Sequence, residues 1–314
     1  VEPLLARNPE NGSLEPAAAS KLLVSGDGLT LTFTLRDDLF WSNGKKIVAE
    51  DYAYSLLRLL QPSLHNWLSD RLAVVKGGEE MLEGAMLARS QVGIMAKDAK
   101  TLVIQLRRPH SLILDLFCEP GTGPVLKESV ERFKNSWSLP QNWVGNGPFV
   151  PVAMDQNYLV LAKNPHHRSA GSIQIDEVRI RWIENASLGT DLYLGGQLDE
   201  FGVRDFSVPS GRLPRLAGRQ DLFFEPDLRT IFLRLNTSKV PLSQLAVRQS
   251  LSMAIDKALL LSSIGVEGEV IANSLVPEGV RGYETPHGYL MNVLGAQKML
   301  RDLGYCGKKK TDGN

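Results

Sequence analysis

The sequence contains three pairs of adjacent side chains that could carry out chemistry. His166-His167 could bind a metal ion, whereas Asp37-Asp38 and Glu79-Glu80 could exchange protons with a substrate. Adjacent side chains point in different directions in most backbones, and no second histidine cluster lies near His166 in the sequence. We therefore expect a surface turn at the histidines, after Asn164-Pro165, and solvated charges at both carboxylate pairs. No metal ion and no cofactor are expected.

No motif for catalysis or nucleotide binding accompanies these pairs. The sequence has no G-x-S-x-G nucleophile elbow, no H-E-x-x-H zinc motif, no Walker A loop and no G-x-G-x-x-G that follows a strand. Gly121-Thr122-Gly123 is too short to be a convincing phosphate cradle. Its remaining interpretations are a tight loop between helices and a stretch of backbone that faces a ligand cleft. The protein is therefore not expected to be an enzyme.

The composition argues against several other classes of protein. Lys+Arg and Asp+Glu each total 35, so the formal net charge is zero and the basic excess typical of nucleic-acid binders is missing. No run of 18 or more apolar residues could form a membrane-spanning helix, and the first residues lack the pattern of a signal peptide. Cys118 and Cys306 are too few for a disulfide framework or a structural zinc site, so two idle thiols are favoured over a single bridge.

Strands and helices must position whatever site these residues form. The first strands expected along the chain form a hairpin. In residues 29–36 leucine and phenylalanine alternate with threonine and arginine, which is the period of a half-buried strand. Gly26-Asp27-Gly28 precedes this run and predicts a hairpin with residues 21–25. Further strands are expected at 101–106, 149–154, 158–163, 177–183 and 230–235.

Helices are expected between these strands. Residues 52–60 place apolar side chains on one helical face, and Pro62 follows the end. Further helices are expected at 79–88, 111–117, 127–137, 188–194, 245–264 (one helix, or a pair divided near Asp256) and 296–303. This order is not a regular βαβα alternation, so it indicates an α/β or α+β architecture with a domain boundary near residues 145–148.

Residues 31–55, LTFTLRDDLFWSNGKKIVAEDYAYS, carry the most specific pattern. They resemble the signature of solute-binding protein family 5, which includes the oligopeptide-, dipeptide- and nickel-binding proteins of ABC importers. That signature is a T-F-x-L-R strand, then W/F-x-D/N-G, then a helix that opens with A-E/Q-D and continues with Y-S. Asn43 stands where Asp is commoner and keeps the turn chemistry.

Weaker landmarks follow in the family's order along about 230 residues. They are DAKTL at 98–102, GPV at 123–125, GNGPF at 145–149, NP at 164–165, GGQLD at 195–199, LNT at 235–237 and VRQSLSMAIDK at 247–257. Two departures stand out: His166-His167 displaces the aromatic residues of the family's N-P-x-Y-W, and Leu242-Ser243 replaces P-F. Each fragment is weak alone, but their collinear order is strong support for the resemblance.

The resemblance implies an α/β (mixed α+β) clamshell of the type II periplasmic-binding-protein kind, with the extra domain typical of peptide-binding members. Residues 1–148 would form that extra domain of lobe one, 149–229 part of the sheet domain of lobe one, and 230–314 the beginning of lobe two. We accordingly expect the chain to be incomplete at both ends, without the strand region before Val1, most of lobe two and the return into lobe one.

The resemblance also implies a function, which is to capture oligopeptides and deliver them to the permease of an ABC transporter. The location would be periplasmic, or extracytoplasmic and membrane-anchored, with no nucleic-acid partner and membrane contact only through a lipid anchor or the permease. By analogy, the residues near the ligand are Trp67, Gly121, Thr122, Gly123, Asn146, Gly147, Arg229, Thr230 and Phe232. Each has a structural alternative: Trp67 could simply pack, Asn146 could only shape a turn, and Arg229 could be a surface charge.

Two alternatives to peptide transport stay open. The same fold could bind a nickel chelate, a sugar or an opine, or it could be the sensor half of a transcription regulator. An upstream helix-turn-helix would favour the regulator, and an upstream signal peptide with a lipobox would favour the importer. In this family, the carboxylate that pairs with the peptide's terminal amine lies in the part of lobe two expected to be missing. We therefore expect the 314-residue chain alone to bind peptides weakly or not at all.

Overall fold

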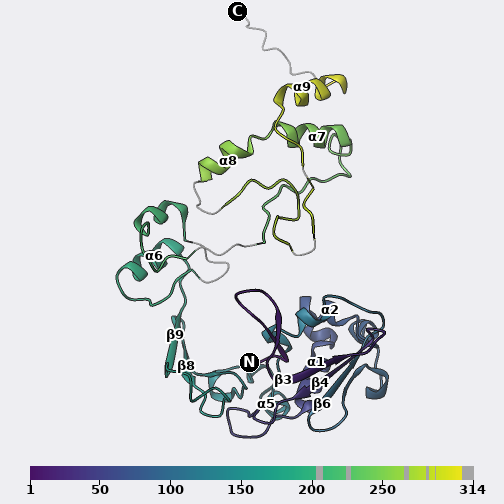
Figure 1. Ribbon diagram of the computed structural model, residues 1–314, viewed down its shortest axis with the longest axis vertical. Helices are drawn as coiled ribbons and strands as arrows, with labels where there is room; N and C mark the ends of the chain where they lie inside the picture. Colours follow the sequence, from purple (N-terminus) through teal and green to yellow (C-terminus); the bar gives the residue numbers. More distant parts are fainter. Residues whose placement is uncertain (203–207, 224–227, 265–268, 281–282, 287, 306–314) are drawn as a thin grey trace, which may run out of the picture. The chain divides into compact units, whose positions relative to one another are not determined.

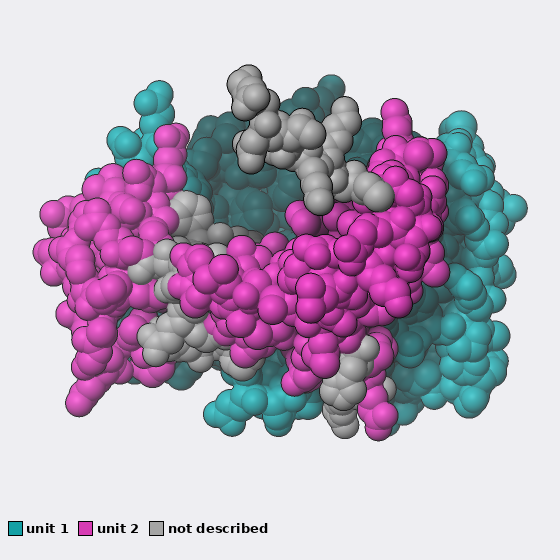
Figure 2. Space-filling model, turned by 90° about the horizontal axis from the view of Figure 1, so that it is seen from above, with its two compact units in different colours: residues 1–182 teal, residues 183–314 magenta. Residues whose placement is uncertain are grey.

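The computed structural model describes residues 1–202, 208–223, 228–264, 269–280, 283–286 and 288–305 (Figure 1). The chain forms two compact units, Val1–Trp182 and Ile183–Asn314, which Figure 2 colours separately. Within the described ranges, no helix has the length and apolar character needed to cross a bilayer.

The first unit is built on a four-stranded antiparallel sheet with the order β3-β4-β6-β5. The strands are β3 (Ala19–Val24), β4 (Thr30–Leu35), β5 (Ile94–Ala96) and β6 (Thr101–Gln105). The predicted hairpin is confirmed, because β3 pairs directly with β4. Leu31, Phe33 and Leu35 are buried while the threonines between them are half-exposed, as the period of two requires.

Helix α1 (Ala49–Leu59) packs against β5 and β6 and closes the core of this unit (Figure 1). Its sequence explains its start, since the Asp51 carboxylate accepts the Val48 backbone N–H at 2.9 Å and satisfies a donor at the helix terminus. Tyr52 and Leu56 are fully buried. In the same core, Phe33 and Phe117 meet edge to face with their ring centroids 5.2 Å apart.

Short elements surround this core. A two-stranded ribbon joins β1 (Leu5–Arg7) to β2 (Leu14–Pro16). The remaining helices of the first unit are α2 (Trp67–Leu72), α3 (Gly78–Leu82), α4 (Ile113–Leu116) and α5 (Lys127–Phe133), with 3-10 turns at Pro62–Leu64, Arg89–Gln91, Pro120–Thr122, Lys134–Ser136 and Pro140–Asn142.

A second antiparallel sheet, with the order β7-β8-β9, ends the first unit. Its strands are β7 (Phe149–Met154), β8 (Tyr158–Lys163) and β9 (Glu177–Arg181). The predicted strands at 149–154 and 158–163 agree with β7 and β8 in both bounds. Asp155 makes the connecting turn, because its carboxylate accepts the backbone N–H groups of Asn157 and Tyr158 at 2.7 and 2.8 Å.

The second unit is mainly helical in its described residues. It contains α6 (Ala186–Leu194), a 3-10 segment (Ser210–Arg215), α7 (Leu245–Ala254), α8 (Lys257–Ile264) and α9 (Val293–Asp302). Helices α7 and α9 pack together, with Val247 and Ala296 buried between them. Of the two alternatives expected for residues 245–264, the pair divided near Asp256 is the one observed. The helix expected to end before Gly304, whose φ is +84°, is confirmed as α9.

Three predictions of local structure were wrong in part or in full. The helix expected at 79–88 ends at Leu82, since Gly84 adopts a φ of +94°. The helix expected at 127–137 stops at Phe133, because Lys134 also has a positive φ, of 47°. The strand expected at 230–235 has no regular structure, and no backbone hydrogen bond between described residues involves it. Alternation alone does not make a strand, which also needs a neighbour to pair with.

Candidate functional site

The main chain of Glu2 lies in a buried polar cluster of the first unit. The Glu2 N–H donates to Oδ1 of Asn146 at 2.8 Å, and the Glu2 carbonyl accepts Nδ2 of Asn146 at 2.9 Å. The Tyr52 hydroxyl of α1 donates to the same carbonyl at 3.1 Å. Asn146 is 2% exposed and Tyr52 is fully buried, so both side chains are committed to this segment.

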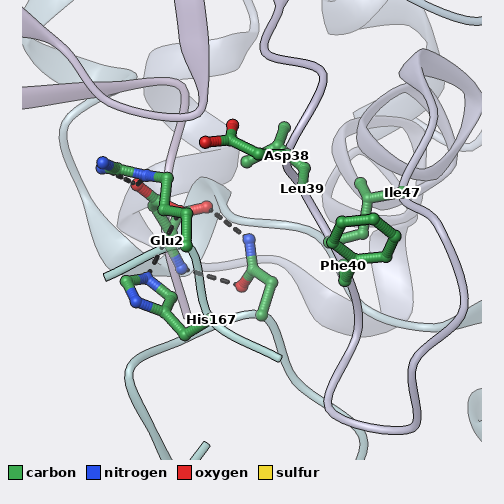
Figure 3. A pocket seen from close by; sticks show the side chains of 8 residues that line it. Glu2, Asp38, Leu39, Phe40, Ile47 and His167 are labelled. Atoms are coloured by element: carbon green, nitrogen blue, oxygen red, sulfur yellow. Dashed lines mark hydrogen bonds and ion pairs between the residues drawn. The ribbon is translucent and has the colours of Figure 1, made fainter. Parts of the chain in front are cut away.

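The carboxylate of Glu2 is held by the loop that follows β8 (Figure 3). Arg168 donates to Oε1 from both Nε, at 3.0 Å, and a terminal nitrogen, at 2.5 Å. Nε2 of His167 lies 3.7 Å from the other oxygen, Oε2. Asp38, Leu39, Phe40 and Ile47 line the opposite side of the small pocket that these residues form.

Burial and the charged partner of Glu2 have opposite effects on its pKa. Burial would raise the pKa of Glu2, but the hydrogen bonds and the positive charge of Arg168, with His167 close by, outweigh burial and lower that pKa. The hydrogen bonds that Arg168 donates to Glu2 in turn raise the pKa of Arg168. Burial raises the pKa of the Tyr52 hydroxyl well above its usual range, so this group remains a neutral donor. Glu2 is thus a paired anion near neutral pH and a poor proton donor.

The turn at residues 145–148 is fixed from both sides. Ser42 donates its backbone N–H to the Gly145 carbonyl at 2.8 Å. Asn164 donates Nδ2 to the Gly147 carbonyl at 2.8 Å, and its own N–H to the Pro148 carbonyl at the same distance. Asn164 is the first residue of the N-P landmark and is fully buried. The turn therefore joins the segment after β4 to the end of β8.

The loop at Gly121-Thr122-Gly123 packs near the same N-terminal segment. A Cβ on Gly123 would lie 3.1 Å from Cβ of Val1, and one on Gly147 would lie 3.1 Å from the Val1 nitrogen. The Thr122 hydroxyl is buried and donates to the Glu119 carbonyl at 2.8 Å, which closes the 3-10 turn. Gly121 approaches Leu68, whose Cδ1 would lie 2.4 Å from an added Cβ.

Trp67, beside Leu68, is the predicted site residue with an exposed side chain in the first unit. It is 52% exposed at the start of α2, and the Arg71 guanidinium lies 5.1 Å from its ring centroid. The first unit thus brings Gly123, Asn146 and Gly147 to the Val1–Glu2 segment and places Gly121 against the neighbour of Trp67.

The other three predicted site residues, Arg229, Thr230 and Phe232, belong to the second unit. Phe232 is 59% exposed. Oγ1 of Thr230 is buried, and no hydrogen-bond partner for it lies among the described residues. The three residues fall in the segment that has no regular secondary structure.

Of the three adjacent pairs of charged or polar residues, only the histidine pair departs from the surface position expected for it. His166 is exposed in a turn after Pro165, as predicted, but the side chain of His167 is only 9% exposed and faces Glu2. Asp37 pairs with Lys100 and Glu79 with Arg107 at the surface. Among the described residues, no three His, Cys, Asp or Glu side chains gather in a way that could hold a metal ion. Cys118 is half-buried and unpaired, and Cys306 lies outside the described residues.

Sequence reasoning missed Glu2, Tyr52 and Arg168 as members of the cluster. Tyr52 was recognised only as part of a helical face, and no motif surrounds Glu2. The one available signal was the replacement of aromatic residues by polar ones after Asn164-Pro165, because a polar side chain needs a partner wherever it is buried.

Comparison with known proteins identifies the family. The sequence model of the bacterial extracellular solute-binding proteins, family 5 (Middle), matches residues 13–313. The chain belongs to this family. The resemblance recognised in the sequence is therefore confirmed.

Members of family 5 from several bacteria are similar to the chain. The periplasmic murein peptide-binding protein MppA of Escherichia coli (strain K12) is 31% identical over 283 residues, which cover 89% of this chain and 52% of that protein. The oligopeptide-binding protein OppA of Bacillus subtilis (strain 168) is 27% identical over 282 residues, with the same two coverages. The chain thus spans about half the length of the curated relatives it matches.

A solved structure agrees with the fold. The crystal structure of the periplasmic oligopeptide-binding protein OppAIV from Borrelia burgdorferi superposes with a TM-score of 0.82 and 29% identity, covering 97% of this chain and 60% of that one. The fold is therefore the mixed α/β fold of type II periplasmic binding proteins, as predicted.

Proposed function

We propose that the chain is part of an extracytoplasmic solute-binding protein that captures oligopeptides and delivers them to the permease of an ABC transporter. The observation that carries this proposal is the likeness of nearly the whole chain to proteins named for peptide binding. The site supports binding over catalysis, because its buried carboxylate is neutralised by Arg168 and its buried hydroxyl is held neutral. The ligand would be bound and released without chemical change.

Of the residues expected near the ligand, the peptide contacts proposed are Trp67, Gly121, Thr122, Gly123, Gly147, Arg229, Thr230 and Phe232. Asn146 borders them, but its side chain is committed to Glu2. Glycines suit such a site, because a peptide bound in extended form pairs with protein main chain and needs close approach. The exposed ring of Trp67 offers a flat apolar face to a ligand side chain. The domain assignment also stays a proposal: extra domain at 1–148, partial sheet domain at 149–229 and the start of lobe two from 230.

Calorimetry tests the function most simply. Protein made from the longest reading frame that contains this chain is titrated with pools of di-, tri- and pentapeptides, and separately with a nickel–histidine chelate and a disaccharide. Peptide binding near one-to-one stoichiometry supports the proposal, whereas binding of the chelate or sugar alone overturns it. Trp67→Ala should weaken peptide binding roughly tenfold. Trp182→Ala is the matched control, since Trp182 is similarly exposed, at 49%.

The 314-residue chain itself should bind peptides weakly or not at all. Solute-binding clamshells enclose their ligand between two lobes, and this chain corresponds to about half the length of its relatives. Titration of the 314-residue protein with the same peptide pools checks this expectation. Tight, stoichiometric binding would contradict it.

A further inference from the structure

Asn146 has no side-chain group available for a ligand. Its Oδ1 accepts the Glu2 N–H at 2.8 Å, and its Nδ2 donates to the Glu2 carbonyl at 2.9 Å and lies 3.4 Å from the Tyr52 hydroxyl. The residue is 2% exposed. The amide binds both polar groups of one residue's main chain, as a neighbouring strand would.

Arg168 holds the other end of the same residue. Its guanidinium donates twice to Oε1 of Glu2, whose side chain is 10% exposed. Among the described residues, no hydrogen bond joins Arg168 to Asn146 directly. The two side chains thus come from different segments, one before β7 and one after β8, and both hydrogen-bond to Glu2.

The segment held in this way borders the proposed peptide contacts. A Cβ on either Gly123 or Gly147 would lie 3.1 Å from an atom of Val1, so these two stretches of main chain pack directly on the residue before Glu2. A shift of Val1–Glu2 would therefore move the main chain at these two glycines. We propose that Asn146 and Arg168 are positioning residues, which act on peptide binding by fixing Glu2 and not by contacting the ligand; this inference rests on the proposed function.

Protonation of Glu2 provides a readout that simple packing would not give. The titratable and charged groups around Glu2 are Tyr52 from α1 and His167 and Arg168 from the loop after β8. Asp38, from the segment after β4, lines the same pocket and acts on Arg168. When Glu2 takes up a proton, its ion pair with Arg168 is lost. Peptide affinity should then fall at acidic pH in the unsubstituted protein, and this acid limb should be absent in Glu2→Gln.

A double-mutant cycle separates positioning from direct contact. Asn146→Ala, Arg168→Leu and the double variant are made in the longest reading frame that contains the chain. Each single change should weaken peptide affinity about tenfold, and the double variant should lose little more than the weaker-binding single variant, because both act through Glu2. Losses that multiply to about a hundredfold would overturn the proposal, since independent contacts add in free energy.

A second measurement does not depend on any ligand. Hydrogen exchange of the Glu2 amide, followed by NMR, should accelerate at least about tenfold in Asn146→Ala, because that amide loses its acceptor. Unchanged exchange in a folded variant would overturn the proposal. If no peptide binds even to the unsubstituted protein, the proposed function fails while exchange still decides whether Asn146 fixes Glu2.

Matched controls and milder variants keep the test decisive. Asn157→Ala changes an exposed asparagine in the β7–β8 turn, and Arg179→Leu removes an ion pair with Glu177 that is exposed. Both controls should leave peptide affinity and Glu2 exchange within about twofold. If Asn146→Ala or Arg168→Leu does not fold, Asn146→Asp and Arg168→Lys replace them. Arg168→Lys should retain part of the affinity because it keeps the charge but not the two-point contact.

Discussion

The indole of Trp143 fills the space beside Gly145 that any side chain would need. A Cβ on Gly145 would lie 2.5 Å from Nε1 and 3.2 Å from Cε2 of Trp143. The indole is itself stacked on Trp137, with centroids 5.5 Å apart and ring planes 18° from parallel, and Arg58 lies 5.5 Å from the Trp137 centroid. The turn that carries Asn146 is thus packed against a pair of stacked tryptophans.

Gly145→Ala should therefore destabilise the protein by about 1–3 kcal/mol, the usual cost of forcing an extra methyl group into a packed site. Urea denaturation measures the loss, and near-UV circular dichroism reports the change at the tryptophans. Gly171→Ala is the control, because nothing lies within 4 Å of its added Cβ. Equal stability of the two variants would contradict the packing described here.

Glu2 should make the stability of the protein depend on acidic pH. Its pKa is lowered in the folded state, so the folded protein binds its proton less readily than the unfolded chain does. The stabilisation is present above the unfolded pKa, about 4.3, and is lost as the pH falls through the lower folded value. Free energies of unfolding from pH 7 to pH 3 should show this loss, and Glu2→Gln should lose less over that window.

A variant at an exposed carboxylate checks that the pH dependence of stability comes from the buried position of Glu2. Glu177 forms an ion pair with Arg179 at the surface of β9, where solvent screens the attraction and such pairs contribute little to stability. Glu177→Gln should therefore follow the unsubstituted protein across the pH range. If Glu2→Gln and Glu177→Gln behaved alike, Glu2 would not be the paired, buried anion that the structure describes.

Lys134 ends α5 in a backbone conformation that L-residues avoid. Its φ is +47°, and it is the one non-glycine residue with a positive φ in the described part of the chain. Lys134→Gly should be neutral or stabilise by up to about 1 kcal/mol, as relief of the strain exceeds the entropy cost of glycine. Lys134→Val should destabilise, because a β-branched side chain suits this φ least. Chemical denaturation of both variants gives the order, and a more stable Lys134→Val would contradict it.

The core of the first unit should depend on Phe33. This ring is fully buried against Phe117 and lies in the middle of the four-stranded sheet. Phe33→Ala should cost about 3–5 kcal/mol, the range for removing a buried aromatic ring. Phe223→Ala, at a ring that is 80% exposed, should change the unfolding free energy by under about 1 kcal/mol. A loss of unfolding free energy in Phe33→Ala as small as that in Phe223→Ala would contradict the burial of Phe33 in the core.

Local patterns were sufficient to predict much of the first unit. The alternation in residues 29–36 found β4 and its hairpin, and the helical spacing from Tyr52 found α1, because both periods reflect one buried face. The collinear landmarks predicted the family and its fold, which the match over residues 13–313 confirmed. Each strand, helix or landmark is encoded by residues close together in the sequence, and the landmarks are recognised by their order.

Features that depend on distant residues were not predictable in the same way. Glu2 and Asn146 are 144 residues apart, and Glu2 and Arg168 are 166 apart, so no spacing rule connects them. The strand expected at 230–235 failed for a related reason, since a strand requires a partner and the pattern of one segment does not reveal it. His167 is likewise buried beside Glu2, which is 165 residues away in the sequence, so its neighbours did not reveal its burial.

Peptide capture is the central claim, and equilibrium binding tests it most directly. Isothermal titration of the protein made from the longest reading frame that contains this chain should show peptide binding near one-to-one, with no response to the nickel–histidine chelate or the disaccharide. Binding of either of those solutes with no binding of any peptide pool would contradict the account.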